Sequence, residues 1–375
     1  MTSRRDDTII VGGGLIGCAL AAELASRGQR VTVVERGEPG DEASGAAAGM
    51  LAPQAEANEP DSFFRFALES RNMFPAWADA LMRETGIDVG YRKIGLLRCA
   101  FGNREDESRD ASDRWQIRAG LPLERRDREA LGRQLSGRLS PEVQSAVFFP
   151  EEAAVDPRAL TRAVWRSAQS RGARVRTGTG VRAFRIRDGV CRGVETDAGP
   201  IEADATVDAA GAWAAFDRGV PLSIPVEPVR GQIVHLRVEG APLETLVCSD
   251  DVYLLPRPDG TVLLGSTTER VGFRKAVTAE AVERLIAAAV RLVPSLAAAQ
   301  FVSAWSGLRP GTPDARPILG DSPVPGLFFA TGHFRNGILL APATARAVAD
   351  LLTGRAPADL SEFSILRFAP SLSEV

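Results

Sequence analysis

The stretch TIIVGGGLIG, residues 8–17, decides the fold of this chain. It begins with a short apolar run rich in β-branched residues, which predicts a buried strand that ends at the first glycine. Residues 14–26 predict a helix, and Gly28 follows them, where glycine commonly ends helices. Residues 31–35 predict the next strand. A strand, a glycine turn, a helix and a second strand within about 30 residues form a βαβ unit.

The glycines of this turn fit the pattern G-x-G-x-x-G. Gly12 permits the tight turn, Gly14 lets the backbone approach a pyrophosphate, and Gly17 lets helix and strand pack closely. Glu35 ends the second strand at the spacing of the acid that binds ribose hydroxyls, which disfavours a 2′-phosphate. The alternative is an incidental glycine turn, but the surrounding βαβ unit favours a dinucleotide site.

The glycine pattern fits both FAD and NAD, and three further features favour FAD. Residues 205–211 predict a strand that returns to the nucleotide and ends in small residues, Gly211 among them. A hairpin region around Val181 precedes that strand. Residues 332–337 lead into the last predicted helix, whose N-terminus would stabilise negative charge on a reduced flavin. The structural alternative for this last turn is an ordinary helix cap.

The remaining segments predict further helices and strands. Residues 61–85 have helical spacing, and the dense charges of residues 103–145 predict solvated helix faces. Asp156 and Pro157 predict the start of a helix that ends near Gly172. The other predicted elements are strands at 174–176, 181–186, 190–196, 201–207 and 327–330, and helices at 278–293 and 337–352.

The length of 375 residues suggests about 2.5 domains. We predict an architecture that combines α/β and α+β parts. A Rossmann-like FAD-binding domain is interleaved with a substrate domain built on a mixed, largely antiparallel sheet. The predicted boundaries are 1–50, 150–215 and 310–355 for the FAD-binding domain, 51–149 and 216–309 for the substrate domain, and 356–375 for a C-terminal tail.

Composition argues against several functional classes. Lys+Arg is 45 and Asp+Glu is 48, and the net charge of −3 lacks the basic surface that binds nucleic acid. The four cysteines contain no C-x-x-C pair, which argues against a zinc ribbon and a disulfide framework. Because His235 and His333 are the two histidines, we expect no metal site and no Ser-His-Asp hydrolase.

The first apolar run could be mistaken for a targeting signal, because residues 15–18 resemble a lipoprotein cleavage box. Asp6 and Asp7 separate the basic residues from that run, and a second strand follows it at once. We therefore interpret the run as part of the fold. No other apolar run approaches the roughly 18 residues that span a bilayer, so we expect no membrane contact and a cytoplasmic enzyme with reduced thiols.

Four stretches together resemble the glycine oxidase family of the D-amino acid oxidase superfamily. They are the turn at 12–17 with Glu35, SGAAAGML at 44–51, WSGLRP at 305–310 and GHFRNGILLAPAT at 332–344. The resemblance runs from Thr8 to about Leu352 and is weakest across residues 100–150. It implies a noncovalent FAD, because none of the four cysteines stands where related sarcosine oxidases attach their flavin.

The resemblance also implies roles for single residues. Arg309 would bind the substrate carboxylate with both arms of its guanidinium, and Tyr253 would donate its hydroxyl to the same carboxylate. Arg335 would border the substrate pocket and Met50 would pack over it. The structural alternatives are a surface ion pair for Arg309, a strand aromatic for Tyr253 and a core position for Met50. The residues implied to bind FAD are Gly12, Gly14, Leu15, Ile16, Gly17, Glu35, Arg36, Ala43, Ser44, Ala48, Gly49, Met50, Val181, Gly211, Gly332, His333, Phe334, Arg335, Asn336, Gly337, Ile338 and Leu339.

Two positions depart from the family pattern. Asp251 stands where the family often has histidine, and Thr268 stands where it often has methionine. We expect both near the pocket. There they would leave the carboxylate anchor intact and alter the preference for the amine. Asp251 would favour a cationic amine or face water.

The implied reaction is oxidative deamination of glycine, and of sarcosine or small D-amino acids. A hydride passes from Cα to the flavin, the imine hydrolyses to a 2-oxo acid and ammonia, and O2 becomes hydrogen peroxide. No side chain has to act as a general base, because the cofactor carries the chemistry. The implied pathway is synthesis of the thiazole of thiamine, and we expect a homo-oligomer. One alternative is an FAD-dependent dehydrogenase of D-amino or N-methyl amino acids that reduces a quinone, and another is a flavin-fold assembly partner.

Overall fold

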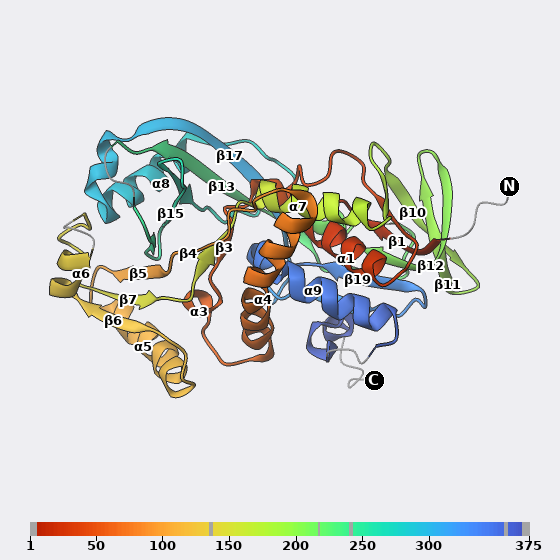
Figure 1. Ribbon diagram of the computed structural model, residues 1–375, viewed down its shortest axis with the longest axis horizontal. Coiled ribbons are helices and arrows are strands. Elements are labelled where there is room, and N and C mark those ends of the chain that lie inside the picture. Colours follow the sequence, from red (N-terminus) through yellow and green to blue (C-terminus); the bar gives the residue numbers. More distant parts are fainter. Residues whose placement is uncertain (1–5, 135–137, 217, 240–242, 356–358, 370–375) are drawn as a thin grey trace.

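The computed structural model describes residues 6–134, 138–216, 218–239, 243–355 and 359–369. Two large sheets lie at opposite ends of the long axis of the molecule, and strands β3 and β4 of a small third sheet lie between them (Figure 1). Within the described ranges, no helix combines the length and the apolar character needed to cross a membrane.

The first large sheet contains the predicted βαβ unit. Strand β1 (Asp6–Val11) pairs in parallel with β2 (Val31–Val34) and with β12 (Gly199–Asp208), so the carboxyl ends of the three strands meet at one edge. Ile9 and Ile10 are fully buried, as expected for a parallel strand that is covered on both faces. The sheet is completed by β9 (Arg174–Arg176), β10 (Val181–Arg187), β11 (Val190–Thr196), β18 (Ile318–Asp321) and β19 (Leu327–Thr331).

A layer of helices packs on this sheet around one apolar core. Helix α1 (Leu15–Ser26) is apolar on nearly all sides, because α7 (Pro157–Ser170) and α9 (Gly337–Leu352) pack against it. Asp156 begins α7 by accepting hydrogen bonds from two backbone N–H groups of its first turn, as its sequence predicts. The long helix α4 (Ser62–Thr85) packs on α9 and α7 and extends the layer toward the middle of the molecule (Figure 1).

The second large sheet is mixed and largely antiparallel. Its longest strands, β13 (Glu227–Arg237) and β17 (Gln300–Gly311), pair along their whole length. Helix α8 (Ala279–Leu292) packs on this sheet and begins at Thr278, whose side chain caps it. The other strands are β5 (Leu96–Ala100), β6 (Glu124–Asp127), β7 (Ser145–Phe149), β14 (Leu246–Cys248), β15 (Tyr253–Pro256) and β16 (Thr261–Gly265), and among them β14 and β5 pair in parallel.

The charged region at 103–145 is only partly helical. Helices α5 (Asn103–Arg118) and α6 (Arg128–Gln134) agree with the prediction, but β6 is a strand, so the prediction of a helix face there was wrong. The strand is the last of its sheet, and charged residues are typical of such edges. The short elements are α2 (Ala43–Ala46), α3 (Pro53–Glu56), β3 (Met50–Leu51), β4 (Arg92–Lys93), β8 (Ala153–Ala154), η1 (Gly211–Trp213), η2 (Pro294–Ala298), η3 (Phe334–Asn336), η4 (Ser361–Phe363) and η5 (Ile365–Phe368).

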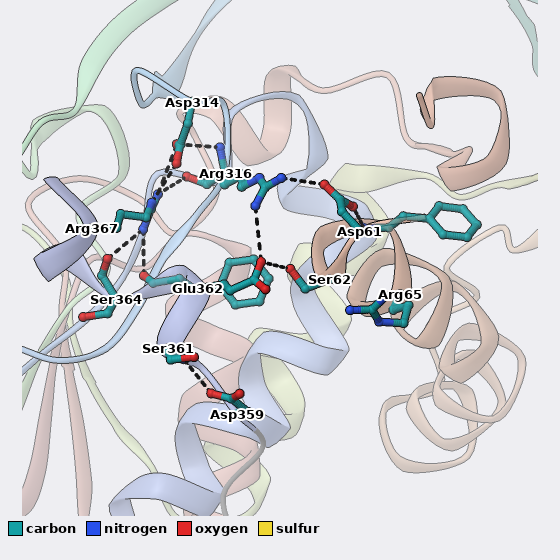
Figure 2. Close-up of polar contacts among 12 residues, drawn as sticks. Asp61, Ser62, Arg65, Asp314, Arg316, Asp359, Ser361, Glu362, Ser364 and Arg367 are labelled. Atoms are coloured by element: carbon teal, nitrogen blue, oxygen red, sulfur yellow. Dashed lines mark hydrogen bonds and ion pairs between the residues drawn. The ribbon is translucent and has the colours of Figure 1, made fainter. Parts of the chain in front are cut away.

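Ion pairs fasten the segment after α9 to the start of α4 (Figure 2). Arg316 donates to Asp61, the N-cap of α4, at 2.6 Å, and its other amino group lies 3.4 Å from a Glu362 carboxylate oxygen. Arg367 donates to Asp314 at 2.7 Å. These contacts join two parts of the chain that are about 300 residues apart in sequence.

Candidate active site

A cavity of about 790 Å³ opens between the two large sheets. Its wall includes Val11 and Val34 at the carboxyl ends of β1 and β2, Ile338 at the start of α9, and Ile233 and Gly307 from the second sheet. The volume lies in the upper part of the range of about 300–1,000 Å³ found for ligand pockets. The cavity can therefore hold a ligand much larger than one amino acid.

The glycine turn forms one end of this cavity, which we call the nucleotide end and define by Gly12, Gly14, Glu35 and Val181. Gly12 has a φ of +108°, and a Cβ there would lie 2.5 Å from the carbonyl oxygen of Ala209. A side chain at this position is therefore excluded by both conformation and space.

A carboxylate and free helix N–H groups give the nucleotide end its polar character. Glu35 Oε2 accepts a hydrogen bond from the backbone N–H of Gly13 at 2.7 Å, and Ser44 Oγ accepts from that of Leu15 at 2.9 Å. Gly14 begins α1 without a capping side chain, so the positive end of the helix faces the cavity. Backbone N–H groups beside a fixed carboxylate fit the pyrophosphate and ribose of a dinucleotide.

The turn before α9 lines the same cavity. The His333 ring is buried and its Nε2 lies 3.1 Å from Thr344 Oγ1, which places the ring against α9. Burial lowers the pKa of His333 to about 3, so this imidazole is neutral at physiological pH and carries no proton for catalysis. Asn336 begins α9 without a side-chain cap, and Gly337 follows it, so a second helix N-terminus opens on the cavity.

Three of the residues implied to bind FAD are absent from the cavity wall. Gly17 supports Gly12 from behind, because a Cβ on Gly17 would lie 2.1 Å from the Gly12 carbonyl oxygen. Gly332 packs against Thr312, and Leu339 is buried in α9. Direct contact of the other residues with FAD stays a prediction. Those that line the cavity are Gly12, Gly14, Leu15, Ile16, Glu35, Arg36, Ala43, Ser44, Ala48, Gly49, Met50, Val181, Gly211, His333, Phe334, Arg335, Asn336, Gly337 and Ile338.

Arg309 lies at the other end of the cavity, on β17. Its Nη1 donates to the Thr267 carbonyl oxygen at 2.9 Å and its Nη2 donates to Ser266 Oγ at 2.6 Å. Two of its five N–H groups thus serve the protein, which leaves three for a ligand. Gly231 on the neighbouring strand makes room for the guanidinium, because a Cβ there would lie 2.3 Å from it.

Tyr253 lines the cavity beside Arg309, and we call the part defined by these two residues and Arg335 the substrate end. Tyr253 faces Gly265 across the strand pair, and a Cβ on Gly265 would lie 2.2 Å from the phenol oxygen. Burial raises the pKa of Tyr253, although Arg309 and Ser266 act in the opposite direction. The hydroxyl therefore stays protonated at neutral pH and can donate a hydrogen bond. Burial also lowers the pKa of Arg309, but a guanidinium remains charged.

Arg335 borders the cavity as predicted, and it forms an ion pair that the sequence did not indicate. Its Nη2 donates to Glu56 at 3.0 Å, and the two side chains are 49% and 29% exposed. Because both partners contact solvent, this pair can open at small cost. Glu56 and Arg335 therefore form a polar, adjustable rim at the substrate end.

A buried polar network holds α3, which carries Glu56. Glu152 is fully buried and accepts from the backbone N–H groups of Gln54 at 2.7 Å and Ala55 at 3.1 Å. Arg71 lies 3.2 Å from the same carboxylate. Burial raises the pKa of Glu152 to about 7, although Arg71 and the two N–H groups favour the ionised form. This wall of the cavity is thus positioned by buried polar groups.

The cavity also contains residues that sequence reasoning missed. Asp251 and Thr268 line it, as expected from their departure from the family pattern. Ser266, Glu56 and Trp213 line it without having been predicted. Ser266 and Trp213 each follow closely on a glycine-containing segment that was singled out, which is the only signal that could have found them.

These features define a class of protein: a dinucleotide-dependent enzyme that binds a small carboxylate opposite its cofactor. Residues 7–351 match the family described as FAD dependent oxidoreductase. The chain belongs to this family, whose cofactor is FAD. The glycine turn, the ribose-binding carboxylate and the volume of the cavity fit that cofactor.

Comparisons with known proteins place the chain near enzymes of amino acid oxidation. It is 39% identical to the glycine oxidase of Geobacillus kaustophilus, over 97% of this chain and 98% of that protein. The crystal structure of the G. kaustophilus enzyme matches with a TM-score of 0.93 and covers 98% of this chain and 100% of that one. The bifunctional protein ThiO/ThiG of Trichormus variabilis is 36% identical over 98% of this chain. The chain spans about half the length of such bifunctional relatives, 56% in this case.

Proposed function

We propose that this chain is an FAD-dependent amine oxidase that deaminates glycine, and also accepts sarcosine or small D-amino acids. The observation that carries the proposal is the pairing of Arg309 and Tyr253 in the same cavity as the glycine turn. The glycine oxidases among its relatives support the choice of substrate. In the overall reaction, glycine, O2 and water give glyoxylate, ammonia and hydrogen peroxide.

The protein's part in this reaction is to position the substrate. When bound, FAD supplies an acceptor for the hydride of the Cα–H bond, and O2 takes up the electrons. Arg309 and Tyr253 hold the carboxylate at two points, which fixes the direction of the Cα–H bond and lowers the entropic part of the barrier. Neither residue accepts a proton at neutral pH, and His333 is neutral and faces α9. The substrate ammonium therefore loses its proton to water before the reaction.

The proposal extends to organisation and context. The first large sheet with α1, α7 and α9 would be the FAD-binding domain, with the predicted boundaries, and the second large sheet would be the substrate domain. The relatives named ThiO/ThiG support a role in making the thiazole of thiamine. A cytoplasmic location and a homo-oligomer stay predictions.

A substrate panel tests the proposed function. Glycine, sarcosine, D-alanine and D-proline are each turned over under air, and hydrogen peroxide and ammonia are measured. We expect equal amounts of the two products with glycine, and a turnover that falls as the Cα substituent grows. A preference for bulky D-amino acids would contradict the glycine assignment. Turnover with a quinone and without peroxide would replace the oxidase by a dehydrogenase.

A further inference from the structure

Trp213 stands beside the nucleotide end of the cavity, in the short helix η1 that follows β12. The guanidinium carbon of Arg36 lies 3.9 Å from the centre of a Trp213 ring, a distance typical of cation–π stacking. Arg36 directly follows Glu35, the predicted ribose-binding acid. Both Arg36 and Trp213 line the cavity, so the stacked pair borders the end that would hold the adenosine part of FAD.

A loop from the other large sheet covers this stacked pair. The loop, residues 266–278, joins β16 to α8. The Phe273 ring centre lies 5.3 Å from that of Trp213 and 5.1 Å from that of Phe216. Lys275 Nζ lies 5.7 Å from the centre of the Trp213 ring. Two aromatic residues after β12 thus contact a loop from the substrate side of the molecule.

Glu42 joins the two cations of this assembly. It accepts a hydrogen bond from Arg36 at 2.9 Å and forms a second ion pair with Lys275. We call Arg36, Glu42, Trp213, Phe273 and Lys275 the clasp. Because its members come from three separate segments, the clasp can open only if the loop moves away from both η1 and the segment after β2.

Hydrogen bonds fix the backbone on both sides of the clasp. Arg218 donates to the Trp213 carbonyl oxygen at 2.9 Å. Arg230 donates to the Ala276 carbonyl oxygen at 2.8 Å, and Ser306 donates to that of Lys275. An exposed loop held by such contacts is preorganised. Its aromatic side chain is therefore present at the cavity wall without a separate ordering step.

We propose that Trp213 is a cofactor-binding residue and that the clasp retains the adenosine half of FAD. The half-buried indole ring and the cation on its face form a wall that shields this half from water. The ion pairs through Glu42 tie that wall to the opposite sheet, so FAD leaves only after the clasp opens. The inference concerns the cofactor and not the amine, so its failure leaves the proposed function unaffected.

The rate of FAD release from the holoenzyme tests this role. The protein is diluted and the recovery of flavin fluorescence is followed. We expect release about tenfold faster in Trp213→Leu, since aromatic contacts with a base are worth about 1–3 kcal/mol. Glu42→Gln, which leaves the ring in place, should release FAD about threefold faster. Phe301→Ala is the matched control, because this aromatic residue of β17 is 57% exposed and lies outside the cavity wall.

Competition with ADP identifies the half of FAD that the clasp contacts. ADP shares only the adenosine half, so Trp213→Leu should weaken both ligands equally. The ADP concentration that displaces half of a saturating amount of FAD should then stay unchanged. A tenfold lower displacing concentration would place Trp213 at the flavin half and overturn the proposal. Unchanged FAD release in both variants would also overturn it. Such a result with a smaller particle in size-exclusion chromatography would assign the aromatic cluster to an interface between copies. If Trp213→Leu does not fold, Glu42→Gln and Lys275→Met decide the question.

Discussion

The nucleotide end and the substrate end of the cavity are built in different ways. At the nucleotide end, backbone groups and glycines form the wall, and Gly12 sits within van der Waals distance of the backbone at Ala209. At the substrate end, the side chains of Arg309 and Tyr253 do the binding, and glycines on neighbouring strands only make room for them. The first end should therefore fail when backbone space is lost, and the second should respond in graded steps to changes of side chain.

The largest effect is expected from Gly12→Ala. The new Cβ would meet the carbonyl oxygen of Ala209 at 2.5 Å, so the turn has to move and the cofactor should not be retained. Purified protein should lack the yellow flavin absorbance. Gly28→Ala is the control, because Gly28 also has a positive φ, +81°, but no atom within 4 Å of an added Cβ. If Gly12→Ala keeps its flavin, the glycine turn does not form the nucleotide end.

The next largest effect is expected from Arg309→Met. Loss of a buried cation that binds the substrate carboxylate should lower kcat/KM for glycine roughly 10³-fold. The flavin absorbance should remain, which separates this end of the cavity from the other. Arg237→Met, at the exposed end of β13, is the control and should retain full activity. A flavin-free Arg309→Met variant would contradict the division of the cavity into two ends.

A smaller effect is expected from Tyr253→Phe. Removal of one hydrogen bond to a charged ligand should raise the dissociation constant of glycolate, a carboxylate without an amine, about tenfold. Because burial raises the pKa of Tyr253, wild-type affinity should hold at pH 10, where an ordinary tyrosine would be half ionised. The change of flavin absorbance on glycolate binding gives both numbers. Equal binding by the two proteins would remove Tyr253 from the substrate end.

The smallest effect on the reaction is expected from Glu152→Gln, whose signal lies in stability. The native pKa of about 7 is raised from about 4.5, so wild-type stability should fall as pH rises from about 4.5 to 7 and stay level above that. The variant lacks this loss, which amounts to about 3 kcal/mol at most. The thermal midpoint of wild type relative to variant should therefore be lower at pH 8 than at pH 5. Parallel midpoints would mean that Arg71 keeps Glu152 ionised.

The same contrast explains what could be predicted from the sequence. The βαβ unit and the cap at Asp156 are local patterns, and the structure confirms them. Strand β6 was missed because its four residues are all charged, and only pairing with β7 makes them a strand. Arg309 and Tyr253 were proposed from a family resemblance, since no spacing in the sequence connects β17 with β15.

The contacts that complete the site depend on tertiary structure alone. The ion pair between Arg335 and Glu56 joins residues 279 positions apart. The clasp brings Trp213 together with a loop of the other sheet. Neither has a local signature, because each depends on how the two large sheets face each other. A single sequence does not encode that arrangement in any periodic pattern.

The central claim is that one cavity holds FAD at one end and a glycine carboxylate at the other. Anaerobic mixing of the purified holoenzyme with glycine tests it most directly. We expect glycine to bleach the flavin absorbance, and readmission of O2 to restore it with one equivalent of hydrogen peroxide per flavin. Arg309→Met should keep its flavin absorbance unbleached at the same glycine concentration. A wild-type flavin that glycine, sarcosine and D-alanine all fail to bleach would contradict the claim.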